Sequence, residues 1–217
     1  MAIHILGNGP SISAFDRGDW PSSDIRVGCN FSNESFDPNY TVIVDVRAMK
    51  QFRGGAEAAY HLGIPAVLSD RAYNYIADTR GGWNRIPDSV INVIDVIPLH
   101  RDKKISNRLA GNSGHHGTMY SIESHPDQSD EVHIWGCDSF WGPDIRSHTD
   151  SIVNHTRDAG GARVRAGVVA PWRKYWTQIF EWYRATQFFI HTSRGVSVSD
   201  IRMPREWKAN VDVVTQE

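Results

Sequence analysis

Short apolar runs rich in β-branched residues recur along the chain, and each is bounded by polar or turn-forming residues. Runs of this length and composition are typical of buried β-strands. The pattern predicts strands at Ala2–Leu6, Ile25–Cys29, Thr41–Val46, Pro65–Leu68, Val90–Ile97, Glu131–Trp135 and Phe188–His191.

Segments with helical spacing alternate with these strands. They are predicted at Ala48–Leu62, Asp70–Asp78, Ser113–His125 and Trp172–Ala185. Strands that alternate with helices favour a mostly parallel sheet with helices on both faces. The expected fold class is therefore α/β.

One domain is expected over residues 1–195, because no internal repeat and no Gly/Ser linker divides the chain. Residues 137–161 have no clear period and are dense in Asp, His, Ser and Arg, which favours a lid-like polar loop. After Gly195 the pattern weakens. Residues 196–217 are therefore predicted to form a tail or an edge strand.

The composition is that of an ordinary globular protein, with 40% hydrophobic and 22% charged residues among 217. The net charge of −2 lacks the basic excess of proteins built to hold a nucleic-acid backbone. Cys29 and Cys137 make neither a zinc set nor a disulfide framework. The chain has no apolar run of about 18 residues and no signal-peptide pattern, so we expect no membrane span and a cytoplasmic location.

The turn after the first strand carries the most informative motif, Gly7-Asn8-Gly9-Pro10-Ser11. Its glycines can adopt positive φ and let a ligand approach the backbone. Proline suits the first position of a helix, whose free amides would form an anion site. The motif lacks the third glycine of the dinucleotide fingerprint and the lysine of a Walker-type loop. It predicts a phosphate or nucleotide turn of another kind, with an ordinary strand-to-helix turn as the alternative.

Other candidates lie where predicted strands end or a helix begins. Asn112 or Ser113 is a natural N-cap, and together with Gly114 it forms either a simple cap or a ligand contact. Asp138 follows a predicted strand and Asp45 lies near the carboxyl end of another, and ligands of open α/β sheets bind beyond the carboxyl ends of the strands. Either carboxylate could hold a ribose hydroxyl, a metal ion or the amides of a neighbouring helix.

Acid–base chemistry is predicted for the polar loop at 137–161. A histidine titrates near neutral pH, and an adjacent carboxylate can orient it and raise its basicity. His148 and His155 are the candidate bases, and Asp138 at the start of the loop is a candidate catalytic carboxylate. The alternative is a solvated surface loop.

Four motifs follow one another between residue 2 and about residue 155. They are Ile5-Leu6-Gly7-Asn8-Gly9-Pro10-Ser11, Cys29-Asn30, Asn112-Ser113-Gly114 and Gly136-Cys137-Asp138-Ser139-Phe140. In this order the set resembles the bacterial sialyltransferases typified by the Campylobacter lipooligosaccharide enzymes. It also resembles their distant relatives, the archaeal-type 6-hydroxymethylpterin diphosphokinase group.

The resemblance implies a Rossmann-like domain that binds a nucleotide. In the sialyltransferases sugar transfer is metal-independent, and a histidine in a lid-like region acts as general base on the acceptor hydroxyl. Carried over by position, His148 or else His155 would be that base. The donor contacts would be Gly7, Asn8, Gly9, Ser11, Asn30, Asn112, Ser113 and Gly114.

Three functions stay open. The first is a glycosyltransferase that takes a nucleotide-activated sugar and transfers it with inversion to an acceptor hydroxyl, with a histidine base and no further cofactor or metal. Its acceptor could be a glycan, a small molecule or a modified nucleic acid, and a homo-oligomer is compatible with the sequence. The second is a Mg²⁺-dependent pyrophosphoryl or phosphoryl transferase, which would give the acidic residues at strand ends a role. The third is a non-catalytic nucleotide-binding module.

Overall fold

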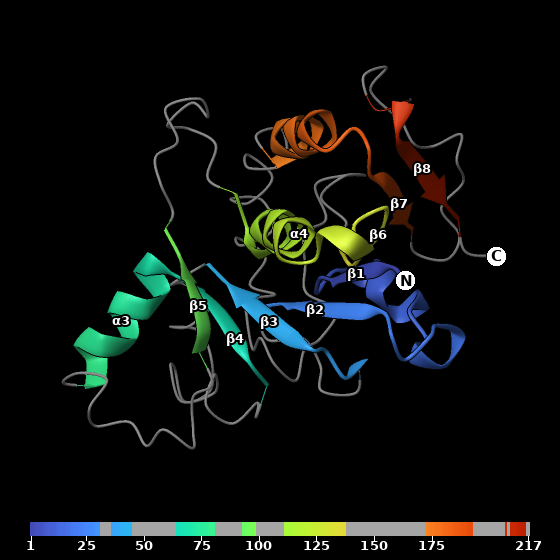
Figure 1. Ribbon diagram of the computed structural model, residues 1–217. Coiled ribbons are helices and arrows are strands. Elements are labelled where there is room, and N and C mark those ends of the chain that lie inside the picture. Colours follow the sequence, from blue (N-terminus) through green and yellow to red (C-terminus); the bar gives the residue numbers. More distant parts are fainter. Residues whose placement is uncertain are drawn as a thin grey trace, which may run out of the picture.

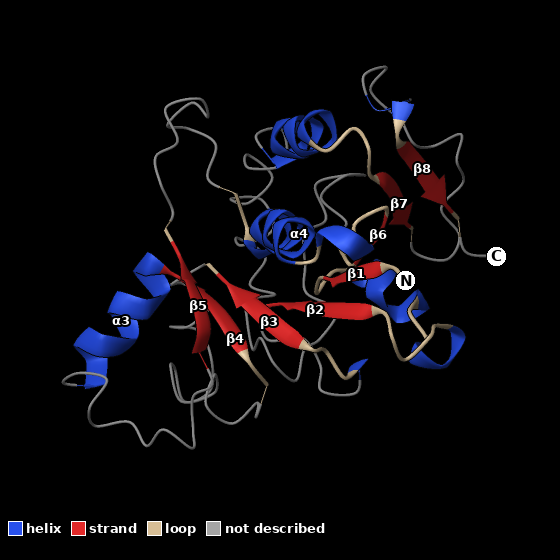
Figure 2. Ribbon diagram, in the orientation of Figure 1, coloured by secondary structure: helices blue, strands red, loops and turns tan. Residues whose placement is uncertain are grey.

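The computed structural model describes residues 1–30, 36–44, 64–80, 93–98, 111–137, 172–192, 207 and 209–215. Figure 1 shows these residues coloured along the sequence, and Figure 2 shows their helices, strands and loops. They form a single parallel sheet with helices packed against it, so the predicted α/β, Rossmann-like class is confirmed.

The sheet has eight strands in the order β5-β4-β3-β2-β1-β6-β7-β8, and every neighbouring pair is parallel. The strands are β1 (Ile3–Leu6), β2 (Ile25–Cys29), β3 (Tyr40–Ile43), β4 (Ala66–Ser69), β5 (Val93–Ile97), β6 (Glu131–Trp135), β7 (Gln187–His191) and β8 (Val211–Val214). The seven strands expected from apolar runs are all present, and residues 45–46 and 90–92 of the expected ranges lie outside the described residues. β8 pairs with β7 at the edge of the sheet.

Helical segments connect several of the strands. They are η1 (Pro10–Ala14), η2 (Arg17–Asp19), α3 (Asp70–Arg80), α4 (Ser113–Ser124), η5 (Pro126–Gln128) and a helix over residues 172–182. The predicted helix Ala48–Leu62 lies outside the described residues. Among the helices that the structure describes, none has the length and apolar character needed to cross a membrane.

The chain changes direction across the sheet at β1. It runs from β1 to β5 towards one edge, returns to the far side of β1 as β6, and continues to β8 at the other edge. The boundary between β1 and β6 is therefore a topological switch point, and open α/β sheets bind ligands beyond the carboxyl ends of the strands at such a point.

Helices cover the two faces of the sheet differently. On one face, α4 and the helix over 172–182 lie side by side (Figure 1) and enclose the main apolar core. That core includes Ile5 of β1, Val42 of β3 and Trp176 of the second helix, all fully buried. On the opposite face, η1 packs Ile12 against Trp135 in a smaller cluster.

The turns that follow β1 and β6 touch through their backbones. The Gly7 amide donates to the Trp135 carbonyl and the Gly9 amide to the Gly136 carbonyl, each at 2.7 Å. Gly136 has φ of +65°, a left-handed conformation that favours glycine. A Cβ on Gly136 would also lie 2.6 Å from the backbone of Gly7. Positions 7 and 136 both require glycine because the two backbone segments lie too close together to leave room for a Cβ.

Replacing Gly7 by alanine tests how strongly the sheet depends on this contact. The new methyl group would lie 2.5 Å from the carbonyl oxygen of Gly136, a backbone atom that cannot rotate away. We expect G7A to lower the free energy of unfolding by about 3 kcal/mol or more, measured by urea denaturation.

Gly117→Ala is the matched control. Gly117 lies inside α4, and the added methyl would meet Val42 and Val27 at 3.6 and 3.7 Å, which are ordinary van der Waals distances. Alanine in a helix interior should raise the free energy of unfolding by about 0.5–1 kcal/mol. Equal stability of the two variants would contradict a close contact between the β1 and β6 turns.

Candidate functional site

The first turn is fixed to both strands that flank β1. The Asn8 side-chain amide donates to the carbonyl of Cys29 at the end of β2, at 2.8 Å. On the other side the Ser11 hydroxyl accepts a 2.8 Å hydrogen bond from the amide of Gly136, after β6. These two side chains therefore hold the turn in place across the switch point.

Asn30, just after β2, adopts a left-handed conformation with φ of 60°. Asparagine tolerates this region better than most residues, but a strained backbone at a strand end is more common at functional sites than elsewhere. Its amide donates to the carbonyl of Val42 at 2.8 Å, and its own carbonyl accepts from the Thr41 hydroxyl. The neighbouring strand thus holds Asn30 in this conformation.

The side chain of Asn30 meets the start of α4. The Ser113 hydroxyl donates to Asn30 Oδ1 at 2.7 Å and accepts from the amide of Val44 at 3.2 Å. Because Ser113 is the donor to Asn30, the oxygen of the Asn30 side-chain amide is engaged. The two N–H groups of that amide remain as donors, and none of the described residues accepts from them.

A capping box begins α4. Asn112 Oδ1 accepts from the His115 amide, and His115 Nδ1 accepts from the Asn112 amide at 3.0 Å. Because Nδ1 is an acceptor, the ring proton of neutral His115 lies on Nε2, which donates to the Trp172 carbonyl at 3.0 Å. The cap therefore also joins α4 to the helix over 172–182.

Burial keeps the histidines of this helix neutral. It lowers the pKa of His115 to about 3, although the bond to the Trp172 carbonyl opposes the shift. Burial likewise lowers the pKa of His116 to about 4. Cys29 is also buried, which raises its thiol pKa to about 12. None of these three groups is suited to proton transfer near neutral pH.

The start of α4 faces the ends of β1 and β6 as well as those of β2 and β3. A Cβ built on Gly114 would lie 3.0 Å from the sulfur of Cys137, which follows β6, and Asn30 meets Ser113 from the other side. The N-terminus of a helix carries a partial positive charge and amides that are not bonded within the helix. The arrangement can therefore bind an anionic group.

Most of the sequence-predicted binding residues lie at this edge. The structure brings together Gly7, Asn8, Gly9, Ser11, Asn30, Asn112, Ser113 and Gly114. The predicted Asp45, Asp138, His148 and His155 lie outside the described residues. Within the described part of the chain, no group of three or more His, Cys, Asp or Glu side chains is arranged to hold a metal ion.

Two residues of the site, His115 and Gly136, make structural contacts that the sequence analysis did not identify. His115 reads as an unremarkable helical histidine, yet it completes the cap with Asn112. The Asn-x-x-His spacing was a usable signal, since capping boxes pair an N-cap side chain with a side chain three residues later. Gly136 belongs to one of the four motifs and follows a predicted strand, but its contact with Gly7 depends on strand order.

The fold and this geometry define the class: a Rossmann-like α/β protein with a glycine turn and a capped helix start at its topological switch point. No protein-family model, no curated protein and no solved structure matches the chain.

Replacing His115 by glutamine should separate its capping role from its titration. Glutamine fits the same capping position but carries no ionisable ring. In the wild type, His115 takes up a proton near pH 6.5 when the chain is unfolded and only near pH 3 when it is folded. The stability contributed by neutral His115 is therefore fully present above pH 6.5, and the free energy of unfolding falls as the pH drops below that value.

Urea denaturation of H115Q between pH 6 and pH 4 measures the difference. For each pH unit, the free energy of unfolding of H115Q should fall by about 1.4 kcal/mol less than that of the wild type. N112A is the companion variant: it loses the cap, at about 1 kcal/mol, but keeps the pH slope. Identical slopes in H115Q and wild type would show that His115 titrates normally in the folded protein.

Proposed function

We propose that this chain is a glycosyltransferase that binds a nucleotide-activated sugar at the carboxyl ends of β1, β2 and β6. The observation that supports it best is the meeting of the glycine turn, Asn30 and the start of α4 at one topological switch point. Nucleotides bind α/β folds at such points, with phosphate near a glycine turn or a helix N-terminus.

The phosphate of the donor would lie between the glycine turn and the start of α4. Gly9 has no Cβ to keep a ligand away, whereas the corresponding side of Gly7 is filled by the backbone of Gly136. The partial positive charge at the α4 N-terminus favours an anion. The amides of Gly7 and Gly9 already donate to Trp135 and Gly136, so the amides at the start of α4 would supply most of the phosphate contacts.

Asn30 would donate from its side-chain N–H groups to an oxygen of the nucleoside. Its oxygen is already bonded to Ser113, which fixes the direction of the donors. A site with a preset donor rejects ligands that lack the matching acceptor, because a buried polar group would stay unpaired. Asn30 is therefore the residue we assign to recognition of the nucleoside.

Transfer would proceed by attack of an acceptor hydroxyl on the anomeric carbon. The bond from that carbon to the phosphate oxygen breaks, the new glycosidic bond forms on the opposite face, and the hydroxyl proton passes to a histidine. His148 or His155 is proposed as this base, with Asp138 as a supporting carboxylate. General-base catalysis of this kind contributes about 10²–10⁴-fold.

A thermal-shift panel tests the donor site. CMP, UDP, GDP, ADP, ATP and several nucleotide sugars are compared with and without Mg²⁺. A ligand at about 100 times its dissociation constant stabilises the fold by about 2.7 kcal/mol, which is a rise of about 5–10 °C here. We expect one nucleotide and its sugar conjugate to give this shift whether or not EDTA is present.

Other outcomes of the panel are equally informative. A shift with ATP and Mg²⁺ alone would support phosphoryl transfer instead. A shift with a nucleotide but no turnover of any sugar conjugate would support a non-catalytic binding module. No shift with any nucleotide would overturn the proposal.

Asn30→Gly tests nucleoside recognition without straining the backbone. Glycine accepts the left-handed backbone at φ of 60° but has no amide side chain. The nucleotide-induced shift should fall by more than half in N30G. Asp37→Gly is the matched control because Asp37 also has positive φ, 47°, and lies at the amino end of β3. D37G should keep the full shift, and an equal loss in both variants would remove Asn30 from the site.

The double variant H148A/H155A tests the base. Transfer of the sugar should fall by about 100-fold or more, while the nucleotide-induced thermal shift stays as in the wild type. His125→Ala, at the far end of α4, is the control and should keep full turnover. Full turnover in the double variant would exclude both histidines as the base.

A further inference from the structure

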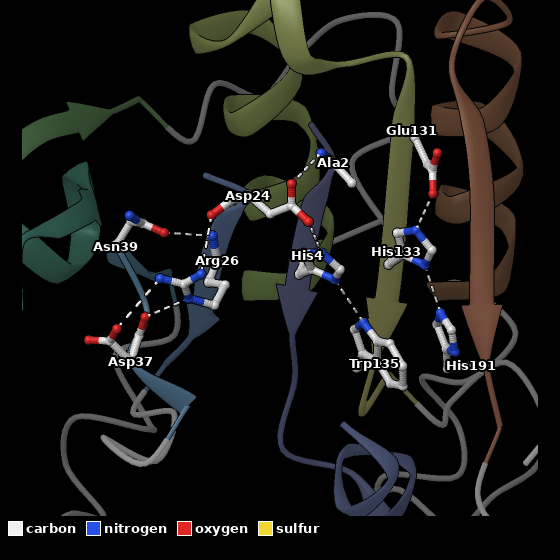
Figure 3. Close-up of polar contacts among 10 residues, drawn as sticks. All are labelled: Ala2, His4, Asp24, Arg26, Asp37, Asn39, Glu131, His133, Trp135 and His191. Carbon is white, nitrogen blue, oxygen red and sulfur yellow. Dashed lines mark hydrogen bonds and ion pairs between the residues drawn. The ribbon is translucent and has the colours of Figure 1, made fainter. Parts of the chain in front are cut away.

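The face of the sheet opposite α4 carries a buried layer of histidines. His4 of β1, His133 of β6 and His191 of β7 lie side by side on adjacent strands (Figure 3) and are only 0%, 4% and 4% exposed. Strands of a parallel sheet are normally apolar on both faces. Three buried rings that can each take up a proton therefore call for a physical explanation.

His4 lies between a carboxylate and an indole. Its Nε2 is 3.3 Å from Asp24 Oδ2, and the Nε1–H of Trp135 donates to its Nδ1, also at 3.3 Å. The indole N–H can only donate, so Nδ1 must be an acceptor. His4 is therefore neutral with its proton on Nε2, where it donates to Asp24.

His133 and His191 form a second unit. Nδ1 of His133 and Nε2 of His191 are 2.8 Å apart, so one proton is shared between them. Nε2 of His133 is 2.6 Å from Oε1 of Glu131, a side chain that is 47% exposed. A protonated His133 could donate to both Glu131 and His191, so His133 keeps both hydrogen bonds when it takes up a proton.

His4 has no such arrangement available. A proton on its Nδ1 would face the indole N–H of Trp135, and two donors cannot bond to each other. Protonation of His4 must therefore break the Trp135 contact. It also places a positive charge beside His133, whose ring is stacked on His4 at a centroid distance of 4.9 Å.

Trp135 connects this layer to the glycine turn. Its ring is stacked on His191 at a centroid distance of 3.3 Å, and its carbonyl accepts the amide of Gly7. The next residue, Gly136, holds Gly9 and Ser11. A displacement of Trp135 would therefore act directly on the turn.

We propose that the histidine layer makes the glycine turn sensitive to acid: protonation of His4 displaces the Trp135 side chain and opens the junction between the β1 and β6 turns. At neutral pH the three rings hold Trp135 and the junction is closed. The opening of the junction can be measured without a ligand. Only an effect of acid on donor binding would rest on the proposed function.

The surroundings of the layer oppose protonation of all three rings at neutral pH. Burial, followed by the charge of neighbouring His133, lowers the pKa of His4 to about 4, against the opposing effect of Asp24. Burial also lowers the pKa of His191 to about 3 and that of His133, where Glu131 opposes the shift. Among the described residues, the other charged groups near the layer are Arg26 of β2, which opposes protonation of His4 and pairs with Asp37, and Asp212 of β8, bonded to Gln187. Trp20 packs on His4 and His133 and carries no charge.

The test is amide hydrogen exchange of the ligand-free protein, followed by NMR. Protection factors of Gly7 and Gly9 are compared between pH 7 and pH 5, with Ile43 of β3 as the internal reference. If His4 becomes exposed when the junction opens, its pKa is about 4 in the closed state and about 6.5 in the open state. Between pH 7 and pH 5, the protection factors of the two glycine amides should therefore fall about 20-fold more than that of Ile43. An equal fall at all three amides would mean that acid acts on the whole sheet, and would overturn the proposal.

His4→Gln provides the variant that does not titrate. Glutamine offers an acceptor for Trp135 and a donor for Asp24 on one side chain. In H4Q the difference between the glycines and Ile43 should disappear, whereas His125→Gln, outside the layer, should behave as wild type. A wild-type response in H4Q would exclude His4 as the trigger.

Trp135→Phe is a second variant, and it keeps the proposal testable if H4Q does not fold. It removes the opposing indole N–H, so the pKa of His4 followed by the NMR signal of its ring should rise by about one unit. An unchanged or lower pKa in W135F would show that the indole N–H does not oppose protonation.

Discussion

The close approach of Gly7 and Gly136 is the constraint on which the rest of the structure depends. Their backbones are near enough that a Cβ on either one would overlap the other. Hydrogen bonds from Gly7 and Gly9 across this junction continue the β1–β6 pairing beyond the strands. Since β1 and β6 are the two strands that border the switch point, the junction fixes where the carboxyl ends of both halves of the sheet meet.

Polar side chains at this edge mainly join separate segments of the chain. Asn8 connects the first turn to β2, Ser11 connects it to Gly136, and Ser113 connects α4 to Asn30. Hydrogen bonds of this kind cost little where both partners are satisfied. They fix the relative positions of the first turn, β2 and the start of α4, and such preorganisation would reduce the loss of entropy if a ligand binds here.

The two faces of the sheet have different physical characters. The face under α4 is a continuous apolar core, whereas the opposite face holds a hydrogen-bonded layer of histidine, tryptophan and carboxylate groups. Apolar packing is insensitive to pH, but a polar layer is stable only while each donor meets an acceptor. The turn after β6 follows Trp135 directly. The side chains of this second face therefore contact the candidate site through Trp135.

The sequence by itself determined the strands, the fold class and the glycine turn, because apolar periodicity and turn residues act over a few neighbouring positions. It also indicated that Asn30 and the start of α4 belong with that turn. Only the tertiary structure decided what His4, His133 and His191 do. Their partners, such as Trp135 at 131 positions from His4, become neighbours through the order of the strands. Strand order depends on how the whole sheet is covered, and no local pattern in the sequence encodes it.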